Sequence, residues 1–258
     1  MRLTDSPWAI STFVVAVVFT AYTVRGLTGF GSGPIVAPLL ALVLDLRTVI
    51  AVSVFLQFVV GCHMVYRARA VMDRRVILRA ALPGMAGGLA GAALLTYLPI
   101  RALLCLVGLC TLWYALRTLR ARRTAVRTPR NPGKAAAYRA GALSGAMEGM
   151  FGAGGPPFVV FLSDYQLEKS RMRGTILGYF LAIDGYLMYC YTVVPRLGSG
   201  PTLMDVRTLS VAAVLLLPAF SGSLFGEHLH RRLSSASFHV WVSIVLAVSG
   251  IAALAKAL

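Results

Sequence analysis

The sequence is poor in charged residues, and acidic residues are the scarcest of them. Charged residues make up 13% of the 258 positions, against 58% for hydrophobic ones, and the mean hydropathy is +0.76. About a quarter of the residues of an ordinary soluble domain are charged. A core of this size cannot bury so much apolar surface, so the composition excludes an ordinary soluble protein and indicates a protein of the lipid bilayer.

The sequence also lacks the residue patterns of enzymes and metal proteins. None of the four cysteines has CxxC or His-paired spacing. All four lie in apolar segments and are interpreted as small packing residues: Cys62, Cys105, Cys110 and Cys190. Walker A and HExxH motifs are absent, and Glu227, His228 and His230 make only a weak metal signal. We therefore predict no catalytic residue, metal or cofactor. Residues 8–24 lack a basic n-region and a cleavage site, so no cleavable signal peptide is expected.

Basic residues outnumber acidic ones by 25 to 9, and their placement indicates topology. Four stretches between apolar segments hold 18 of the 25, namely 67–79, 117–139, 169–173 and 231–232. The positive-inside rule places all four in the cytoplasm and both termini outside, with residues such as Arg47 and Arg101 external. The net charge of +16 is thereby explained without nucleic acid as a partner.

Ten apolar segments follow one another, and two of them are too short to span a membrane. The segments are 8–25, 33–44, 48–66, 76–97, 101–118, 135–150, 156–163, 172–194, 206–227 and 237–257. A spanning helix needs about 20 residues. Segments 33–44 and 156–163 each follow a glycine cluster, so each is expected to form a broken or re-entrant hairpin with the helix before it.

An internal repeat accounts for this coincidence. A shift of 123 residues lays 25–34 over 148–157 and matches three glycines and a proline, and a shift of 135 lays 83–91 over 218–226. Each half has an odd number of crossings, so the halves insert with opposite orientation. We predict an all-α polytopic membrane protein of two inverted-topology repeats, each a glycine-rich hairpin plus three spanning helices. The first repeat is 1–118, a basic cytoplasmic linker is 119–134, and the second repeat is 135–258.

The glycine clusters are expected to bind an anion. Non-helical backbone at membrane depth is tolerated only where it is buried in protein or lines a cavity. Each short helix would begin there with free N–H groups and a partial positive charge, which suits a small anion. The alternative is close helix packing, which suits Gly84–Gly91 and Ser221–Gly226 better.

Four polar residues at membrane depth are further candidates. Arg25 and Glu148 occupy the same repeat position, so they either form a salt bridge between the halves or serve as an anion ligand and a protonatable coupling group. Asp184 lies mid-helix among four tyrosines and is either hydrogen-bonded by them or a proton carrier. Gln57 either donates to the substrate or bonds across helices.

At these motifs the sequence resembles the sulfite exporter TauE/SafE family. The resemblance rests on the paired motifs at 26–34, with Pro38, and at 149–157, and covers nearly the whole chain. It implies bacterial inner-membrane carriers for anions such as sulfite, thiosulfate or organosulfonates, often exporters and proton-linked. It also implies that Gly29, Gly31, Gly33, Pro34, Gly152, Gly154, Gly155 and Pro156 border the substrate. Ser32 stands where a glycine is common, and its hydroxyl could donate to an oxyanion or narrow the pocket.

Together these features predict a secondary transporter, with export favoured, for a small sulfur-containing anion, working by alternating access about a midplane site. Its partners would be the lipid bilayer, the anion and protons as the coupling ion, and a homodimer is one alternative for its assembly. An anion channel and a structural membrane subunit with glycines for packing alone are the alternative functions. An intramembrane enzyme is disfavoured, because no nucleophile–base pair lies at depth.

Overall fold

All regular secondary structure in the described part of the chain is helical. The structure, a computed structural model, describes residues 7–121, 133–163, 167–197 and 202–230, with residues 251, 254 and 255. Within these ranges there are nine helices and no strand: α1 Pro7–Thr28, α2 Gly33–Leu40, α3 Leu46–Ala68, α4 Arg74–Tyr97, α5 Ile100–Ala121, α6 Gly133–Phe151, α7 Gly155–Ser163, α8 Lys169–Leu197 and α9 Val206–His230. Most of the expected linker and of the last apolar segment, 237–257, lies outside the described residues.

Five of these helices, α1, α3, α4, α8 and α9, are long and apolar enough to cross a membrane. The surface agrees with a lipid surrounding, because Leu78 and Leu82 on α4 and Val214 and Leu217 on α9 are each at least 70% exposed. Side chains of this kind in contact with water would be an aggregation hazard, whereas hydrocarbon accepts them. For the residues that the structure describes, the prediction of an all-helical polytopic membrane protein is therefore confirmed.

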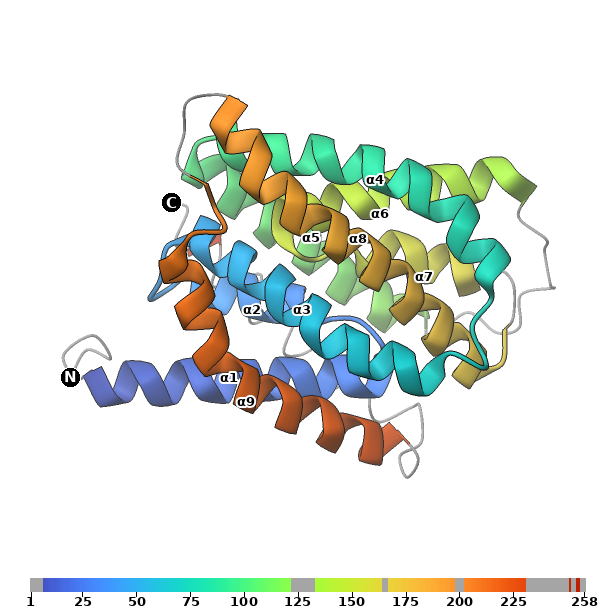
Figure 1. Ribbon diagram of the computed structural model, residues 1–258, viewed down its shortest axis with the longest axis horizontal. Coiled ribbons are helices and arrows are strands. Elements are labelled where there is room, and N and C mark those ends of the chain that lie inside the picture. Colours follow the sequence, from blue (N-terminus) through green and yellow to red (C-terminus); the bar gives the residue numbers. More distant parts are fainter. Residues whose placement is uncertain are drawn as a thin grey trace.

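The helices form two close pairs with α3 and α8 between them. Helices α1 and α9 lie side by side along one edge of the molecule, and α4 packs on α6 along the other (Figure 1). Glycines allow the close approach of each pair: a Cβ added to Gly91 of α4 would overlap the Ala146 carbonyl oxygen of α6, and one on Gly226 of α9 would overlap that of Thr23. These contacts are typical of small-residue helix packing in membranes.

Two of the helices are interrupted at glycines and resume as short helices. Between α1 and α2, Gly29 and Gly31 have φ of +88° and +95°, and between α6 and α7, Gly152 has φ of +63°. Residues other than glycine rarely adopt this backbone conformation, so the glycines end the longer helices. A proline then follows in the first turn of each short helix, where its missing N–H removes no helical hydrogen bond.

The basic stretches 67–79 and 169–173 meet at one end of the bundle. Asp73 caps the start of α4 by accepting from the N–H groups of Arg75 and Val76, and Arg171 of α8 lies 2.8 Å from its carboxylate. Partial burial opposes ionisation of Asp73, but the hydrogen bonds of Val76 and Arg171 outweigh it and lower the pKa. The stabilisation from this contact is thus present at neutral pH and lost as pH falls through the lowered pKa. At the opposite end, Arg47 donates to the carbonyls of Leu95 and Leu98.

We expect Gly91→Val to destabilise the protein by at least about 1–3 kcal/mol, because the new side chain forces α4 away from α6. Neighbouring Ala90 is exposed, so Ala90→Val is a matched control without that cost. Thermal unfolding of the purified protein in detergent measures both. Equal unfolding temperatures for the two variants would contradict the close α4–α6 contact.

Candidate functional site

The two interruptions lie against each other inside the bundle. A Cβ added to Gly33, the first residue of α2, would overlap the carbonyl oxygen of Gly152, and one on Gly155, the first residue of α7, would overlap the ring of Phe30. The start of each short helix is therefore in contact with the interruption before the other, although 122 residues separate the two starts in the sequence. Only glycine fits at either position without moving a neighbour.

A buried polar cluster lies beside this contact. Its four members come from four helices, α1, α3, α6 and α8, and each is at most 2% exposed: Arg25, Gln57, Glu148 and Asp184. The Arg25 guanidinium donates from Nη1 to Oε1 of Gln57, and its Nη2 lies 3.5 Å from Oδ2 of Asp184. Breaking such a pair leaves an uncompensated charge in the interior, so the geometry of Arg25 and Asp184 is strongly constrained.

Gln57 connects this ion pair to the interruption before α7. Its Nε2 lies 3.1 Å from Oε1 of Glu148 and 3.2 Å from the Gly152 carbonyl oxygen. The other oxygen of Glu148, Oε2, accepts the backbone N–H of Gly154 at 2.6 Å, while Ser144 donates to the Gly154 carbonyl at 2.6 Å. The interrupted backbone thus has side-chain partners in the place of water.

Arg25 does not form the salt bridge with Glu148 that the sequence suggested as one of two alternatives. The ion pair of Arg25 is with Asp184, and Gln57 stands between Arg25 and Glu148. The carboxyl groups of Glu148 and Asp184 also lie within interaction range of each other. Two of the tyrosines near Asp184 donate elsewhere, Tyr179 to the Gly141 carbonyl and Tyr191 to that of Gly149.

The expectation of free N–H groups at both short helices does not hold for three residues at the start of α7. The Gly154 N–H is taken by Glu148, and Pro156 and Pro157 have none. At α2 the N-cap residue is Ser32, whose side chain makes no capping hydrogen bond. Its buried Oγ has no hydrogen-bond partner, and the same holds for Nε of Arg25 and Oδ1 of Asp184. Unpartnered donors therefore remain on the α1–α2 side of the contact.

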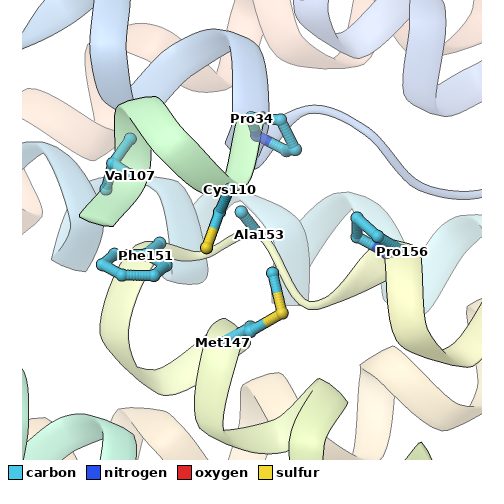
Figure 2. Close-up of a pocket in the computed structure, with 7 residues that line it drawn as sticks. All are labelled: Pro34, Val107, Cys110, Met147, Phe151, Ala153 and Pro156. Atoms are coloured by element: carbon cyan, nitrogen blue, oxygen red, sulfur yellow. The ribbon is translucent and has the colours of Figure 1, made fainter. Parts of the chain in front are cut away.

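A small pocket opens where the two short helices begin. It is lined by Pro34, Val107, Cys110, Met147, Phe151, Ala153 and Pro156, and Figure 2 shows a proline from each short helix at its wall. It has room for about one water molecule, too little for sulfite. Of the expected substrate-binding residues, Pro34 and Pro156 line this pocket, whereas Gly29 faces Arg173 and Gly31 has only Val24 nearby. The structure is thus closed around the interruptions.

Several polar residues of this region were not singled out from the sequence. Tyr22 donates to the Ser53 carbonyl, and Ser53 and Ser144 each sit one helical turn before a cluster residue. Arg173 donates from Nη2 to the Gly26 carbonyl at 2.6 Å, beside the first interruption. Tyr22, Ser53 and Ser144 could have been found from the sequence, because each lies three or four positions before a polar residue of the cluster on an otherwise apolar helix. Arg173 was not identified because it belongs to the basic stretch 169–173, which was explained by membrane topology alone.

An all-helical membrane domain with interrupted helices that meet at a buried polar cluster is the architecture of a membrane transporter. The family comparison gives the same class. The model of the sulfite exporter TauE/SafE family matches residues 14–253, and the chain belongs to that family, whose members are membrane transporters of sulfur-containing anions. Neither a search of curated proteins nor a search of solved structures gave a match.

We expect Arg25→Met to destabilise the protein by about 3–5 kcal/mol, because it leaves the Asp184 carboxylate buried without its cation. Adding Asp184→Leu should recover much of the lost stability, because it removes the unpaired carboxylate. Thermal unfolding of the two single variants and the double variant measures the coupling.

The pair of Arg67 and Glu227 is the control, because the Arg67 side chain is 45% exposed and the pair remains accessible to solvent at one end of the bundle, so neutralising Arg67 should cost only about 0–1 kcal/mol. Strictly additive losses at Arg25 and Asp184 would contradict the buried ion pair.

Proposed function

We propose that the protein is a secondary transporter, with export favoured, for a small sulfur-containing anion such as sulfite, thiosulfate or an organosulfonate. The observation that carries the proposal is the contact of two helix interruptions beside a buried arginine and unpartnered donors. Buried ionisable groups in a membrane domain are costly and default to a functional role. The substrate class is that of the family.

The contacts between helices support an inverted repeat as the basis of alternating access. Gly91 of the first half lies against the carbonyl of Ala146 in the second half. The repeat equivalent of Gly91 is Gly226, and that of Ala146 is Thr23. Gly226 lies against the carbonyl of Thr23 in the same way. The starts of α3 and α8, Leu46 and Lys169, also differ by the shift of 123. Two halves with equivalent packing can exchange inward-facing and outward-facing arrangements about a shared site.

The substrate would lie between the interruptions, with Ser32 and Arg25 as its donors. An oxyanion accepts strong hydrogen bonds from a guanidinium and a hydroxyl, and both Oγ of Ser32 and Nε of Arg25 are buried without a partner. The backbone of Gly29, Gly31, Gly33, Gly152, Gly154 and Gly155, with Pro34 and Pro156, would border it. Because Gln57 is already bonded on both sides, it would hold Arg25 in place and contact the anion only after rearrangement.

Glu148 and Asp184 are the proposed coupling groups. The cluster contains one guanidinium and two carboxyl groups, all removed from solvent. A group that gains and loses a proton here changes the net charge that the closed site must accommodate. Protons are thus the coupling ion that the cluster could bind.

The proposed setting is the bacterial inner membrane with the basic end of the bundle in the cytoplasm. Asp73 and Arg171 belong to two of the basic stretches and are paired at that end. The positive-inside rule then orients the molecule.

We expect Ser32→Ala to weaken anion binding by about 10–100-fold while leaving the unfolding temperature unchanged or slightly raised. The Ser32 hydroxyl makes no hydrogen bond of good geometry within the protein, and its polar neighbour Tyr22 already donates to the Ser53 carbonyl, so its removal should affect substrate binding more than stability. Calorimetric titration with sulfite, thiosulfate and an alkanesulfonate measures the affinity. Ser221→Ala is the control, since that exposed hydroxyl bonds within its own helix. Unchanged affinity in Ser32→Ala would remove Ser32 from the site.

We expect anion flux into proteoliposomes to depend on the pH gradient, and Glu148→Gln or Asp184→Asn to abolish that dependence. Each substitution keeps the shape of the side chain and removes its titration. Flux with and without an imposed pH gradient is the measurement. If both variants transport normally with the same response to pH as the unaltered protein, neither residue is a coupling group.

A further inference from the structure

The amino end of α7 is already occupied by a side chain of the protein, the carboxyl group of Glu148. Oε2 of Glu148 accepts the N–H of Gly154, the residue before α7, at 2.6 Å. A carboxylate at this place is stabilised by the N–H group and by the partial positive charge of the helix end, just as a bound oxyanion would be. The substrate site proposed above is therefore partly filled.

Two residues in the first turn of α7, Pro156 and Pro157, offer no N–H, and the amide of Gln57 is directed at Glu148 itself. A substrate that takes the N–H of Gly154 must therefore displace Glu148 from it. An ionised Glu148 opposes the exchange twice, because it holds the donor and because two like charges would be buried together.

We propose that Glu148 is a tethered competitor of the substrate, which leaves the Gly154 N–H when it takes up a proton and so makes proton and anion bind together. This inference rests on the proposed function and adds the sign of its coupling. Proton and anion would then cross the membrane in the same direction, so that a proton gradient directed into the cell opposes export, and export requires an outward anion gradient larger than the inward proton gradient. One proton with a monovalent anion carries no net charge, and a divalent anion would engage the second carboxyl group, Asp184, as well.

The groups around Glu148 favour it over Asp184 as the first proton acceptor on substrate binding. From α1 it is faced by Arg25 and Tyr22, from α3 by Gln57, and from α8 by Asp184, Tyr179 and Tyr191. On the α4 side, the residue after Glu148, Gly149, packs against the backbone of Gly88, which carries no charge. Asp184 keeps Arg25 as a direct partner at 3.5 Å, whereas Glu148 loses its backbone donor when the anion arrives.

The test is the direction in which protons move when the anion binds. Thiosulfate and methanesulfonate, which do not titrate near neutral pH, are added to the purified protein in weak buffer with a pH-sensitive dye. We expect proton uptake, larger for thiosulfate than for methanesulfonate, and an apparent Kd that rises by up to about tenfold per pH unit for a single coupled proton.

In Glu148→Gln the uptake with methanesulfonate should vanish and its Kd should become independent of pH. Glu227→Gln, which neutralises a glutamate at the basic end of the bundle, is the matched control and should behave like the unaltered protein. The sign of the pH change in the unaltered protein decides the question even if Glu148→Gln does not fold.

The outcomes separate this inference from the proposed function. Binding with proton release, or with no pH change, would overturn the competition while leaving the anion carrier in place. Absence of any binding by either anion would overturn both. Unchanged proton uptake in folded Glu148→Gln would assign the coupling to another group and overturn the role of Glu148.

Discussion

A helix interrupted inside a membrane exposes N–H and C=O groups that lipid cannot satisfy. In this protein the groups next to the second interruption are satisfied by side chains: Glu148 accepts the N–H of Gly154, Ser144 donates to its carbonyl and Gln57 donates toward Gly152. Those side chains bring a charge into the interior, which in turn requires a counter-charge. Arg25 and Asp184 complete the set. The polar cluster and the two interruptions therefore depend on each other, and neither would be stable alone.

The proposed repeat gives the two halves a common scaffold but different chemistry. The position equivalent to Glu148 holds Arg25, and the position equivalent to Asp184 holds Gly61. A Cβ on Gly61 would sit 3.8 Å from Nη2 of Arg25, an ordinary van der Waals contact, so this position borders the guanidinium. The proposed duplication would account for two interruptions that meet at one point. Divergence at a few positions would then explain why the cluster holds one arginine and two carboxyl groups, an asymmetry that the proposed coupling of an anion to protons requires.

The sequence predicted the helices, their interruptions and the residues of the cluster more completely than their contacts. Apolar length and the glycine–proline order were sufficient to locate α2 and α7, because both properties act within a few residues. The pairing of Arg25 with Asp184 was missed, since repeat symmetry suggested Glu148, and only the packing of α1, α3 and α8 brings the guanidinium beside Asp184. The capping of α7 by Glu148 was missed for a similar reason. It requires the chain to turn back after Gly152 so that Gly154 returns to the helix it has just left.

The most direct test of the account is an experimental structure of the protein with selenite, the selenium analogue of sulfite, located by its anomalous signal. We expect a single site at membrane depth between the first turns of α2 and α7, within reach of Ser32 and Arg25, with the Glu148 side chain turned away from Gly154. Selenium located at the ends of the bundle, with the two glycine segments closed and Glu148 still bonded to Gly154, would contradict it.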